Sequence, residues 1–389
     1  MEHPQPGGIM RILFRLILRP KFINIVNPTL DNLSPSLRQL SLKIHDHPEL
    51  GFEERYAHDL LCAYMETHGF QVTRHYLGLN TAWRGSTLGI NSEMDGLSGI
   101  GHACGHNLIA ISGCGVAIAV KATLEALNIP GKIILLGTPA EERVGGKIIL
   151  LERGAYKDMD LCIMCHPGPG PSNSANFGTT TAMQEAEVEY FGQSAHAGAA
   201  PWEGTNALDA AFLAYSSIAV LRQQIKPDHR IHGILGGKNW SANVIPDYAH
   251  MTWVVRAPTH GEVDEFAERV KASTACKVKI NFTSPYYELL QNSVLGKEFA
   301  DKVGRNYGMV SDGDGSSAST DFGNVSFAIP TEPKGGNHTP AFAKAAATMA
   351  AHEATMTVTK GLALTGLRAL QDKAFLKAVS TTLLLENVH

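Results

Sequence analysis

The sequence of 389 residues predicts an α/β protein, in which a smaller α+β domain is inserted into a mixed-sheet domain. Three observations support this prediction. Strand-like and helix-like segments alternate from about residue 71 to residue 165. Residues 181–286 then follow the order β-α-β-β-α-β, which forms a complete split βαβ (ferredoxin-like) domain. The flanking segments, 31–180 and 287–389, look incomplete alone, so we expect them to form one domain around the insertion.

Each element of the first domain has its own signal. Residues 34–69 predict two helices, and Pro35 lies near the start of the first. A long apolar helix is expected from about residue 107 to residue 127, and a short one at 146–152. Apolar runs bounded by turn residues predict strands at 71–76, 81–84, 87–93, 132–138 and 160–165. This alternation is typical of a sheet with helices on both faces, whose sites lie at the carboxyl ends of its strands.

The inserted domain opens with a strand of alternating polarity, and a later strand alternates Met251, Trp253 and Val255. Its expected elements are a strand at 182–191, a helix at 207–224, strands at 230–235 and 250–256, a helix at 262–272 and a strand at 277–282. The remainder, 292–389, is predicted to be mostly helical. We interpret its alanine-rich run at 341–354 as a buried helix.

The first thirty residues differ from the rest, so we treat 1–30 as a basic N-terminal extension. Arg11, Arg15 and Arg19 recur at every fourth position, and no acidic residue occurs between Glu2 and Asp31. Because arginines interrupt the apolar run, it fits neither a secretory signal nor a membrane span, and no stable membrane insertion is expected. A basic amphipathic helix fits a mitochondrial presequence, a surface-seeking helix or a disordered start, and these alternatives stay open.

Composition excludes some partners and indicates a compartment. The formal net charge of −4 and the pI near 6.5 give no basic surface, so a nucleic-acid partner is not expected. The six cysteines form no regular framework, which favours free thiols in a reducing compartment and a cytoplasmic location. Among them, only Cys104 has neighbours of chemical interest.

The segment Gly-His-Ala-Cys-Gly-His-Asn places Cys104 and His106 two residues apart. Other residues of the types that bind metals follow expected strands or lie in a glycine-rich loop: Glu141, Glu142, His166 and His338. Thiolate, imidazole and carboxylate are the ligands that zinc takes, and two neighbouring ions can share them. Each residue alone has an ordinary structural explanation. The whole set is hard to obtain from packing, so we interpret the protein as a two-metal hydrolase.

A longer series of motifs extends this interpretation. In chain order they are His47-Pro48-Glu49-Leu50, Asn91–Leu97 (NSEMDGL), Gly99–Asn107 (GIGHACGHN), Thr138–Glu142 (TPAEE), Cys165-His166-Pro167, Ser194–Ala197 (SAHA), Asn243–Asp247 (NVIPD), Ser319–Phe322 (STDF) and Asn337–Pro340 (NHTP). In these motifs the sequence resembles metallopeptidase family twenty, the aminoacylase and carboxypeptidase family. Within it, the sequence is most similar to the branch of dipeptidases related to aminoacylase. The resemblance extends from Leu40 to Leu370.

The resemblance implies a zinc-exopeptidase-like catalytic domain that binds two divalent metal ions per subunit, with Zn²⁺ preferred and Mn²⁺ or Co²⁺ as alternatives. The metal ligands that it implies are Cys104, His106, Glu142, His166 and His338. Cys104 stands where other branches have a bridging aspartate. The resemblance also implies Glu141 as the general base and Asp95 as an acid that orients a ligand.

The resemblance further implies that residues 181–286 form a dimerisation domain and that the protein is a homodimer. His196 in this domain would reach into the partner subunit's site and steady the oxyanion. Asn243 and Arg256 match positions that hold the carboxylate or carbonyl of a small-molecule substrate, and a planar guanidinium suits a carboxylate.

Together these expectations give one function: hydrolysis of the amide bond of a dipeptide or N-acyl amino acid with a free carboxylate, by metal-activated water with Glu141 as base. The match over Gly99–Asn107 favours dipeptides, including those with a basic C-terminal residue. Three alternatives stay open. One is an amidohydrolase of N-acyl or aromatic conjugates. The second is a degenerate, non-catalytic dimeric scaffold, because Arg143 follows the glutamates and the segment from Asp321 to His338 is short. The third uses Cys104 as a nucleophile.

Overall fold

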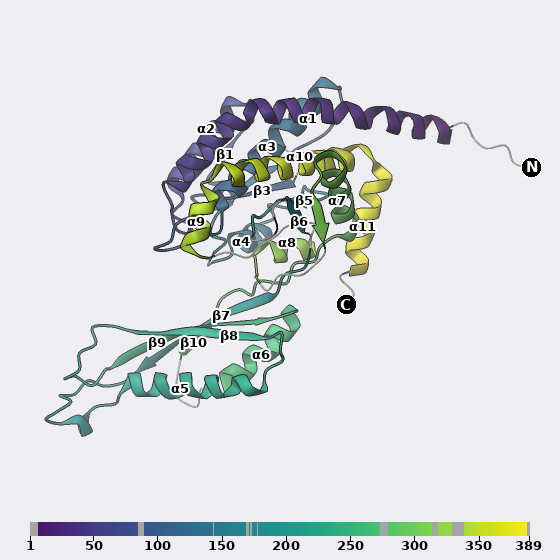
Figure 1. Ribbon diagram of the computed structural model, residues 1–389. Coiled ribbons are helices and arrows are strands. Elements are labelled where there is room, and N and C mark those ends of the chain that lie inside the picture. Colours follow the sequence, from purple (N-terminus) through teal and green to yellow (C-terminus); the bar gives the residue numbers. More distant parts are fainter. Residues whose placement is uncertain are drawn as a thin grey trace, which may run out of the picture. The chain divides into compact units, whose positions relative to one another are not determined.

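The computed structural model describes residues 7–84, 89–142, 144–168, 171, 173–176, 178–272, 279–312, 318–328 and 338–386. The chain divides into two compact units (Figure 1). Unit 1 comprises residues 1–179 and 290–389, and unit 2 comprises residues 180–289 between them. The insertion expected at 181–286 lies within unit 2.

Unit 1 contains a five-stranded sheet in the order β1-β2-β4-β3-β5. Its strands are β1 (Thr73–Arg74), β2 (Trp83–Arg84), β3 (Gly89–Glu93), β4 (Leu135–Thr138) and β5 (Cys162–Ile163). β3 runs parallel to β4 and β5, whereas β2 is antiparallel to β4 and β1. All of β3 is buried, because the centre of the sheet is covered on both faces. The prediction of a mixed sheet is therefore confirmed.

The helix α3 (His106–Ala126) packs against β3 and β4 at the centre of unit 1. By length and composition it could cross a membrane, but 89% of its apolar window is buried inside the structure, as in a core helix. α1 (Gly7–His45) and α10 (Met349–Gln371) pack against α3 (Figure 1). The other elements of unit 1 are α2 (Arg55–Thr67), η1 (Tyr76–Gly78), α4 (Gly146–Glu152), α7 (Ser293–Tyr307), α8 (Phe322–Ala328), α9 (Pro340–Ala346), α11 (Lys373–Glu386) and the parallel strands β6 (Ser174–Asn176) and β11 (Val310–Asp312).

The N-terminal helix is longer than the sequence predicts. The pattern predicts a helix from about residue 34, whereas α1 begins at Gly7 and carries Pro35 in its interior. Apolar residues at a spacing of four are buried in the core before that point: Phe22, Val26 and Leu30. The end expected for the basic extension, residue 30, therefore falls within a packed helix. Burial of the apolar face offsets the hydrogen bond that a proline removes.

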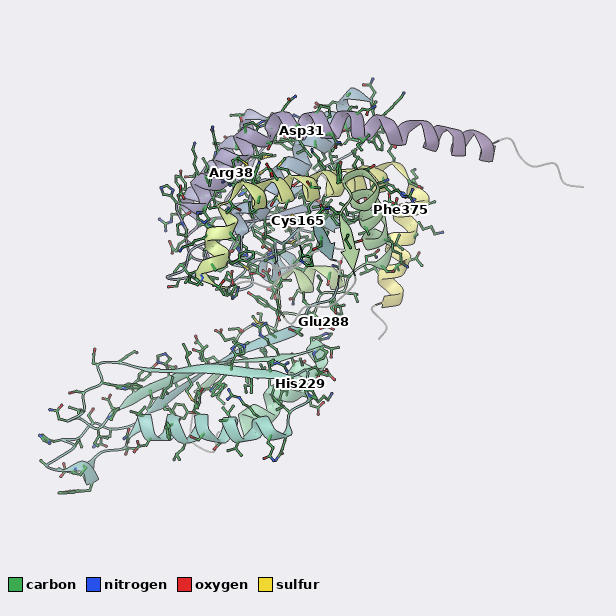
Figure 2. The ribbon with its side chains drawn as sticks, in the orientation of Figure 1. Asp31, Arg38, Cys165, His229, Glu288 and Phe375 are labelled. Carbon is green, nitrogen blue, oxygen red and sulfur yellow. The ribbon has the colours of Figure 1, made fainter. Side chains whose placement is uncertain are left out.

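Polar contacts also tie α1 to the C-terminal part of unit 1. Asp31 and Arg38 both lie on α1 (Figure 2). The carboxylate of Asp31 is 2.6 Å from the ammonium of Lys360 on α10. The guanidinium of Arg38 donates a hydrogen bond to the carbonyl oxygen of Ala347, between α9 and α10. The first helix is therefore an integral part of unit 1.

The prediction of one buried helix at 341–354 is wrong. α9 ends at Ala346, and α10 begins at Met349. The hydroxyl of Thr348 accepts a hydrogen bond from the backbone N–H of Ala351, so it caps a new helix there. Only Ala346 and His352 are buried in this run. An alanine run predicts helix from propensity, but its small side chains carry no signal for burial.

Unit 2 has the element order β-α-β-β-α-β that the sequence predicts. Its elements are β7 (Ala182–Phe191), η2 (Pro201–Glu203), α5 (Ala207–Leu221), η3 (Arg222–Gln224), β8 (Arg230–Gly237), β9 (Tyr248–Ala257), α6 (His260–Ala272) and β10 (Lys279–Phe282). The four strands form an antiparallel sheet in the order β10-β7-β9-β8, and both helices pack against it. β8 is one edge of this sheet. Residues 277 and 278 of the last expected strand lie outside the described residues.

We expect Leu30→Ala to lower the free energy of unfolding by about 2–5 kcal/mol, because it empties a fully buried position in the core of unit 1. Urea denaturation followed by circular dichroism measures this change. Asn24→Ala, at an exposed position of the same helix, is the control and should stay within about 0.5 kcal/mol of wild type. Equal stability of both variants and wild type would contradict the packing of residues before 31.

Candidate metal centre

The expected ligands meet at one edge of the unit 1 sheet. β3, β4 and β5 are parallel neighbours, so their carboxyl ends lie side by side. Asp95 follows β3, Glu141 and Glu142 follow β4, and His166 follows β5. His106 is the first residue of α3, which packs on β3. Chain segments far apart in the sequence therefore deliver their side chains to the same edge.

Cys104 lies in a tight turn before α3. Gly105, the next residue, has a φ of +77°, which glycine adopts without strain. A Cβ at this position would also lie 2.5 Å from the ring of Pro167. The close approach of the two loops brings Cys104 Sγ to 3.4 Å from His166 Nε2. The glycine is thus required by both the backbone angle and the contact.

Two histidines are oriented by hydrogen bonds from their Nδ1 atoms. His106 Nδ1 is 3.0 Å from Asp95 Oδ1, and His166 Nδ1 donates to the carbonyl oxygen of Pro167 at 2.8 Å. In each ring this leaves Nε2 to face the other candidate ligands, an arrangement common around bound metals. Burial lowers the pKa of His166 to about 4, so its ring is neutral and has a lone pair to donate at neutral pH.

His338 is brought to the centre by its own backbone. Its N–H donates to the carbonyl oxygen of Ala103 at 3.0 Å, and its φ is +77°. Its Nε2 is 3.1 Å from Glu142 Oε2, although 52% of the side chain is exposed. The short segment expected before His338 still allows this approach. Residues 329–337 of that segment, and Arg143, lie outside the described residues.

The five candidate ligands form two overlapping groups. Cys104, His106 and His166 make one group, and Cys104, Glu142 and His338 make the other; within each group the ligand atoms lie within 4.8 Å of one another. Among the described residues, the buried His106 Nε2 and Glu142 Oε1 make no hydrogen bond, although Glu93 Oε2 lies 3.3 Å from His106 Nε2. A polar atom that is buried without a partner is costly, and a metal ion would satisfy both. The mixed sulfur, nitrogen and oxygen donors of these two groups therefore fit divalent metal ions such as zinc.

Glu141, the candidate base, lies beside these groups and is buried. Its Oε2 is 3.8 Å from His106 Nε2. Burial, followed by the carboxylates of Glu93 and Glu142, raises the pKa of Glu141 well above its usual value. A carboxylate with a raised pKa is better matched to accepting a proton near neutral pH.

The structure adds three charged residues to which the sequence analysis assigned no role, although two of them, Glu93 and Asp321, lie in its motifs. Lys147 Nζ is 2.7 Å from Glu93 Oε1 and 2.6 Å from Asp321 Oδ1, and all three side chains are fully buried. The other carboxylate oxygen of Glu93 is 3.3 Å from His106 Nε2. Lys147 thus places a positive charge among the carboxylates beside the candidate ligands. The sequence contained one signal for Lys147. A positive side chain in the first turn of a helix is unfavourable beside the positive end of the helix dipole, so a lysine at this position of α4 indicates nearby acidic partners.

His196 and Asn243 lie together in unit 2, on loops that adjoin the Phe191 end of β7 and the Tyr248 start of β9. The backbone N–H of Ala197 donates to the carbonyl oxygen of Asn243 at 3.0 Å. His196 Nδ1 accepts hydrogen bonds from the N–H groups of Gly198 and Ala199 at 3.2 and 3.1 Å. The neutral ring therefore carries its proton on Nε2, which can act as a donor.

Arg256 does not lie with His196 and Asn243. It is near the far end of β9, where it pairs with Met183 and Arg230, and its Nε is 3.3 Å from His232 Nε2. The eight-residue step from Tyr248 to Arg256 spans about 27 Å at the rise of an antiparallel strand. Within one copy of unit 2, these candidate substrate-binding residues are therefore at opposite ends of the sheet.

Comparison with known proteins gives consistent relationships. Residues 180–275 match the family model of the M20 peptidase dimerisation domain. The chain is 37% identical to an Xaa-Arg dipeptidase of Mus musculus, over 90% of this chain and 89% of that protein, and 36% identical to the Homo sapiens protein of that name, over the same shares. It is 31% identical to one of the p-aminobenzoyl-glutamate hydrolase proteins of Escherichia coli (strain K12), over 59% of this chain and 52% of that protein.

Two solved structures share the fold. An aminobenzoyl-glutamate utilization protein from Klebsiella pneumoniae aligns with a TM-score of 0.68 at 18% identity, over 89% of this chain and 99% of that chain. A Bacillus subtilis protein, described as a dinuclear metal-binding peptidase of the M20 family, aligns with a TM-score of 0.61 at 17% identity, over 88% and 99%. At these identities the likeness concerns the fold alone.

We expect Lys147→Met to destabilise unit 1 by about 3–5 kcal/mol, because it leaves the carboxylates of Glu93 and Asp321 buried without their cation. Chemical denaturation of the metal-loaded and metal-free protein measures the loss. Lys157→Met, at an exposed position shortly after α4, makes the same chemical change and should be nearly neutral. A Lys147→Met protein as stable as its control would contradict the role of the buried ammonium.

Proposed function

This chain belongs to the M20 peptidase family, as its identity to relatives along nearly its whole length shows, and we propose that its substrates are dipeptides with a free carboxylate and a basic C-terminal residue. It is a metal-dependent hydrolase of the dipeptidase and N-acyl amino acid amidohydrolase type. The observation that carries the proposal is the pair of ligand groups sharing Cys104 beside Glu141. The preference for a basic residue comes from the name of the similar dipeptidases.

The proposed roles of the residues follow from their atoms. Metal ions held by Cys104, His106, Glu142, His166 and His338 would supply positive charge that polarises the amide carbonyl and lowers the pKa of water towards about 7. Glu141 accepts the proton of the attacking water on a carboxylate oxygen and later delivers it to the leaving amine nitrogen. Water is thus added across the C–N bond: the acyl carbon gains the hydroxyl, and the amine gains the hydrogen. Asp95 holds the ring of His106 in place.

Unit 2 supplies the remaining roles in this proposal. The Nε2–H of His196 donates to the substrate oxygen that becomes negative in the transition state, and Asn243 lies beside it as a second polar group. The guanidinium of Arg256 pairs with the substrate carboxylate. A dipeptide extends only about 7 Å, so it cannot contact both ends of one β9 strand. We therefore infer that a complete site takes His196 and Asn243 from one copy of the chain and Arg256 from another.

Exposed apolar surface on unit 2 supports a homodimer. Phe212, Leu213 and Val220 on α5 are 60%, 67% and 70% exposed, and Ile234 on the edge strand β8 is 67% exposed. Apolar patches and open strand edges are typical of surfaces that pair with another chain. The match to a peptidase dimerisation domain covers these elements. We propose that α5 and β8 form the surface between the two copies.

Zinc is the metal that we propose for this centre. The donor set of one thiolate, imidazole nitrogens and a carboxylate suits Zn²⁺ better than it suits Mn²⁺, which prefers oxygen ligands, and Co²⁺ is the closer alternative. Elemental analysis of the purified protein distinguishes these metals. Two zinc ions per chain support the proposal, and manganese bound instead would contradict it.

The alternative functions receive less support. Amidohydrolysis of aromatic N-acyl amino acids is the second candidate, because a p-aminobenzoyl-glutamate hydrolase protein is also a relative; comparing turnover of the two substrate classes decides between them. A non-catalytic scaffold does not explain why the candidate metal-binding side chains lie so close together. Purified protein without bound metal would favour the scaffold. A Cys104 nucleophile is disfavoured because burial raises the pKa of its thiol, whereas nucleophilic attack needs the thiolate.

We propose a cytoplasmic location. The five described cysteines form no disulfide, as expected in a reducing compartment. A mitochondrial presequence is the alternative, and its cleavage would have to precede Phe22, which is part of the core. A fusion of residues 1–20 to a fluorescent reporter tests this, because mitochondrial import of the reporter would contradict the proposal.

We expect Glu141→Gln to retain about two metal ions per chain while its kcat falls by about 10²- to 10⁴-fold, because the amide cannot accept the proton of water. Elemental analysis and hydrolysis of dipeptides ending in arginine or lysine measure the two effects. Glu152→Gln, an exposed position at the end of α4, is the matched control and should keep full activity. A fully active Glu141→Gln protein would contradict the assignment of the base.

We expect His196→Ala and Arg256→Ala each to be inactive alone, yet to recover about a quarter of wild-type activity when co-expressed. In a heterodimer of the two variants, one of the two sites has both side chains intact, and random pairing makes half of the dimers mixed. Activity of the co-expressed mixture measures this recovery, and the heterodimer purified from it by tandem affinity tags should reach about half of wild-type activity. If that heterodimer has no activity although both homodimers bind metal, the composite site is wrong.

A further inference from the structure

We propose that Glu54 is a positioning residue for the base, because its buried carboxylate fixes the backbone turn that presents Glu141. This inference rests on the proposed role of Glu141 and extends it to a residue from a different part of the chain. Glu54 lies at the start of α2, 86 residues before the turn that it contacts.

The turn before Glu141 has an unusual conformation. Ala140 has a φ of +56°, in the left-handed region that residues other than glycine rarely adopt. It is fully buried, so no water can stabilise its backbone groups. Such a residue keeps this conformation only where its surroundings fix it, and it immediately precedes the candidate base.

Four contacts fix Ala140. Its N–H donates to Glu54 Oε1 at 2.8 Å. Its carbonyl oxygen accepts from the N–H groups of Gly145 and Gly146 at 3.1 and 3.3 Å, which closes the loop after the glutamates. Gly51 lies against its side chain, since a Cβ on Gly51 would be 2.9 Å from Ala140 Cβ. Only the contact with Glu54 uses a side-chain acceptor.

The residue after Glu141 is held in the same way. The N–H of Glu142 donates to Asp95 Oδ2 at 3.0 Å. Both neighbours of Glu141 thus have their backbone N–H groups bonded to buried carboxylates, one from the segment before α2 and one from the end of β3. A displacement of about 1 Å in a catalytic group can cost about 10²-fold in rate, so this double restraint matters for proton transfer.

Helix capping does not account for the burial of Glu54. The N–H groups at the start of α2, on Tyr56 and Ala57, donate to the carboxylate of Glu49, each at 3.0 Å. The side chain of Glu54 makes no capping bond. Its two oxygens instead accept from Ala140 N–H and, at 2.7 Å, from the hydroxyl of Thr81. Both oxygens of the Glu54 carboxylate are thus used, one by the turn before Glu141 and the other by the side chain of Thr81.

The protonation state of Glu54 does not decide this contact. Burial, assisted by the negative charge of Asp95, raises the pKa of Glu54 to about 7. The carboxylate and the neutral acid both keep an acceptor oxygen towards Ala140 N–H. An amide has the same shape and the same acceptor, so Glu54→Gln preserves the hydrogen bond, whereas Glu54→Met keeps the volume and removes the acceptor.

The test compares Glu54→Met, Glu54→Gln and the control Glu53→Met, an exposed neighbour. For Glu54→Met we expect kcat to fall about 10- to 100-fold, with KM within about threefold and two metal ions retained. The Ala140 amide should lose its protection from hydrogen exchange. Glu54→Gln should keep kcat within about threefold and keep that protection, and Glu53→Met should match wild type.

Gly51→Ala gives an independent perturbation of the same turn and replaces Glu54→Met if that variant does not fold. Its new methyl group presses on Ala140, so kcat should again fall with metal retained. The proposal is overturned if Glu54→Met or Gly51→Ala keeps wild-type kcat, if Glu54→Gln is as impaired as Glu54→Met, or if metal is lost. A wild-type protein that hydrolyses no amide refutes the proposed function instead, and the exchange of the Ala140 amide then still shows whether Glu54 holds the turn.

Discussion

The burial of acidic side chains is the constraint on which the rest of this structure depends. Five acidic side chains, all buried, lie in unit 1 at or beside the carboxyl edge of its sheet: Glu54, Glu93, Asp95, Glu141 and Asp321. Carboxylates removed from water are costly unless they are paired or hydrogen-bonded. Lys147 pairs with two of them, His106 contacts three, and backbone N–H groups satisfy Asp95 and Glu54. The candidate metal ligands lie beside this network, where divalent cations would complete the neutralisation.

The geometry of the candidate centre depends on hydrogen bonds that orient its side chains and on sharp backbone turns. Parallel strands bring the candidate ligands to one edge of the sheet. Hydrogen bonds then orient two of their rings: Asp95 orients His106, and the carbonyl oxygen of Pro167 orients His166. Left-handed residues make the sharp turns, at Gly105, Ala140 and His338. Each is held by a neighbouring segment, so the geometry of the centre depends on packing throughout unit 1.

Unit 2 separates its candidate substrate-binding residues along one sheet. Its sheet keeps His196 and Asn243 at one end and Arg256 at the other, and the stiffness of a ten-residue strand maintains that separation. The proposed function places both groups on one small substrate, so a second copy of the chain would have to supply the missing end. Exposed apolar residues on α5 and the open edge of β8 provide a surface for such pairing.

The sequence by itself predicted the β-α-β-β-α-β order of unit 2, the mixed sheet of unit 1 and a set of residue types that bind metals, because local patterns and strand ends carry that information. It proposed Cys104 and His106 from their spacing, and Glu141 and Glu142 from their place after a strand, and the structure brings these four side chains to one edge of the sheet. It did not identify Lys147 with Asp321, or Glu54 with Ala140, since these partners are 174 and 86 residues apart and no local pattern links them. It also misjudged the alanine-rich run, and it gave no sign that Asn243 and Arg256 lie at opposite ends of one sheet. Only the tertiary structure decided these points, because the burial of a charge and the distance between two side chains depend on how distant segments pack.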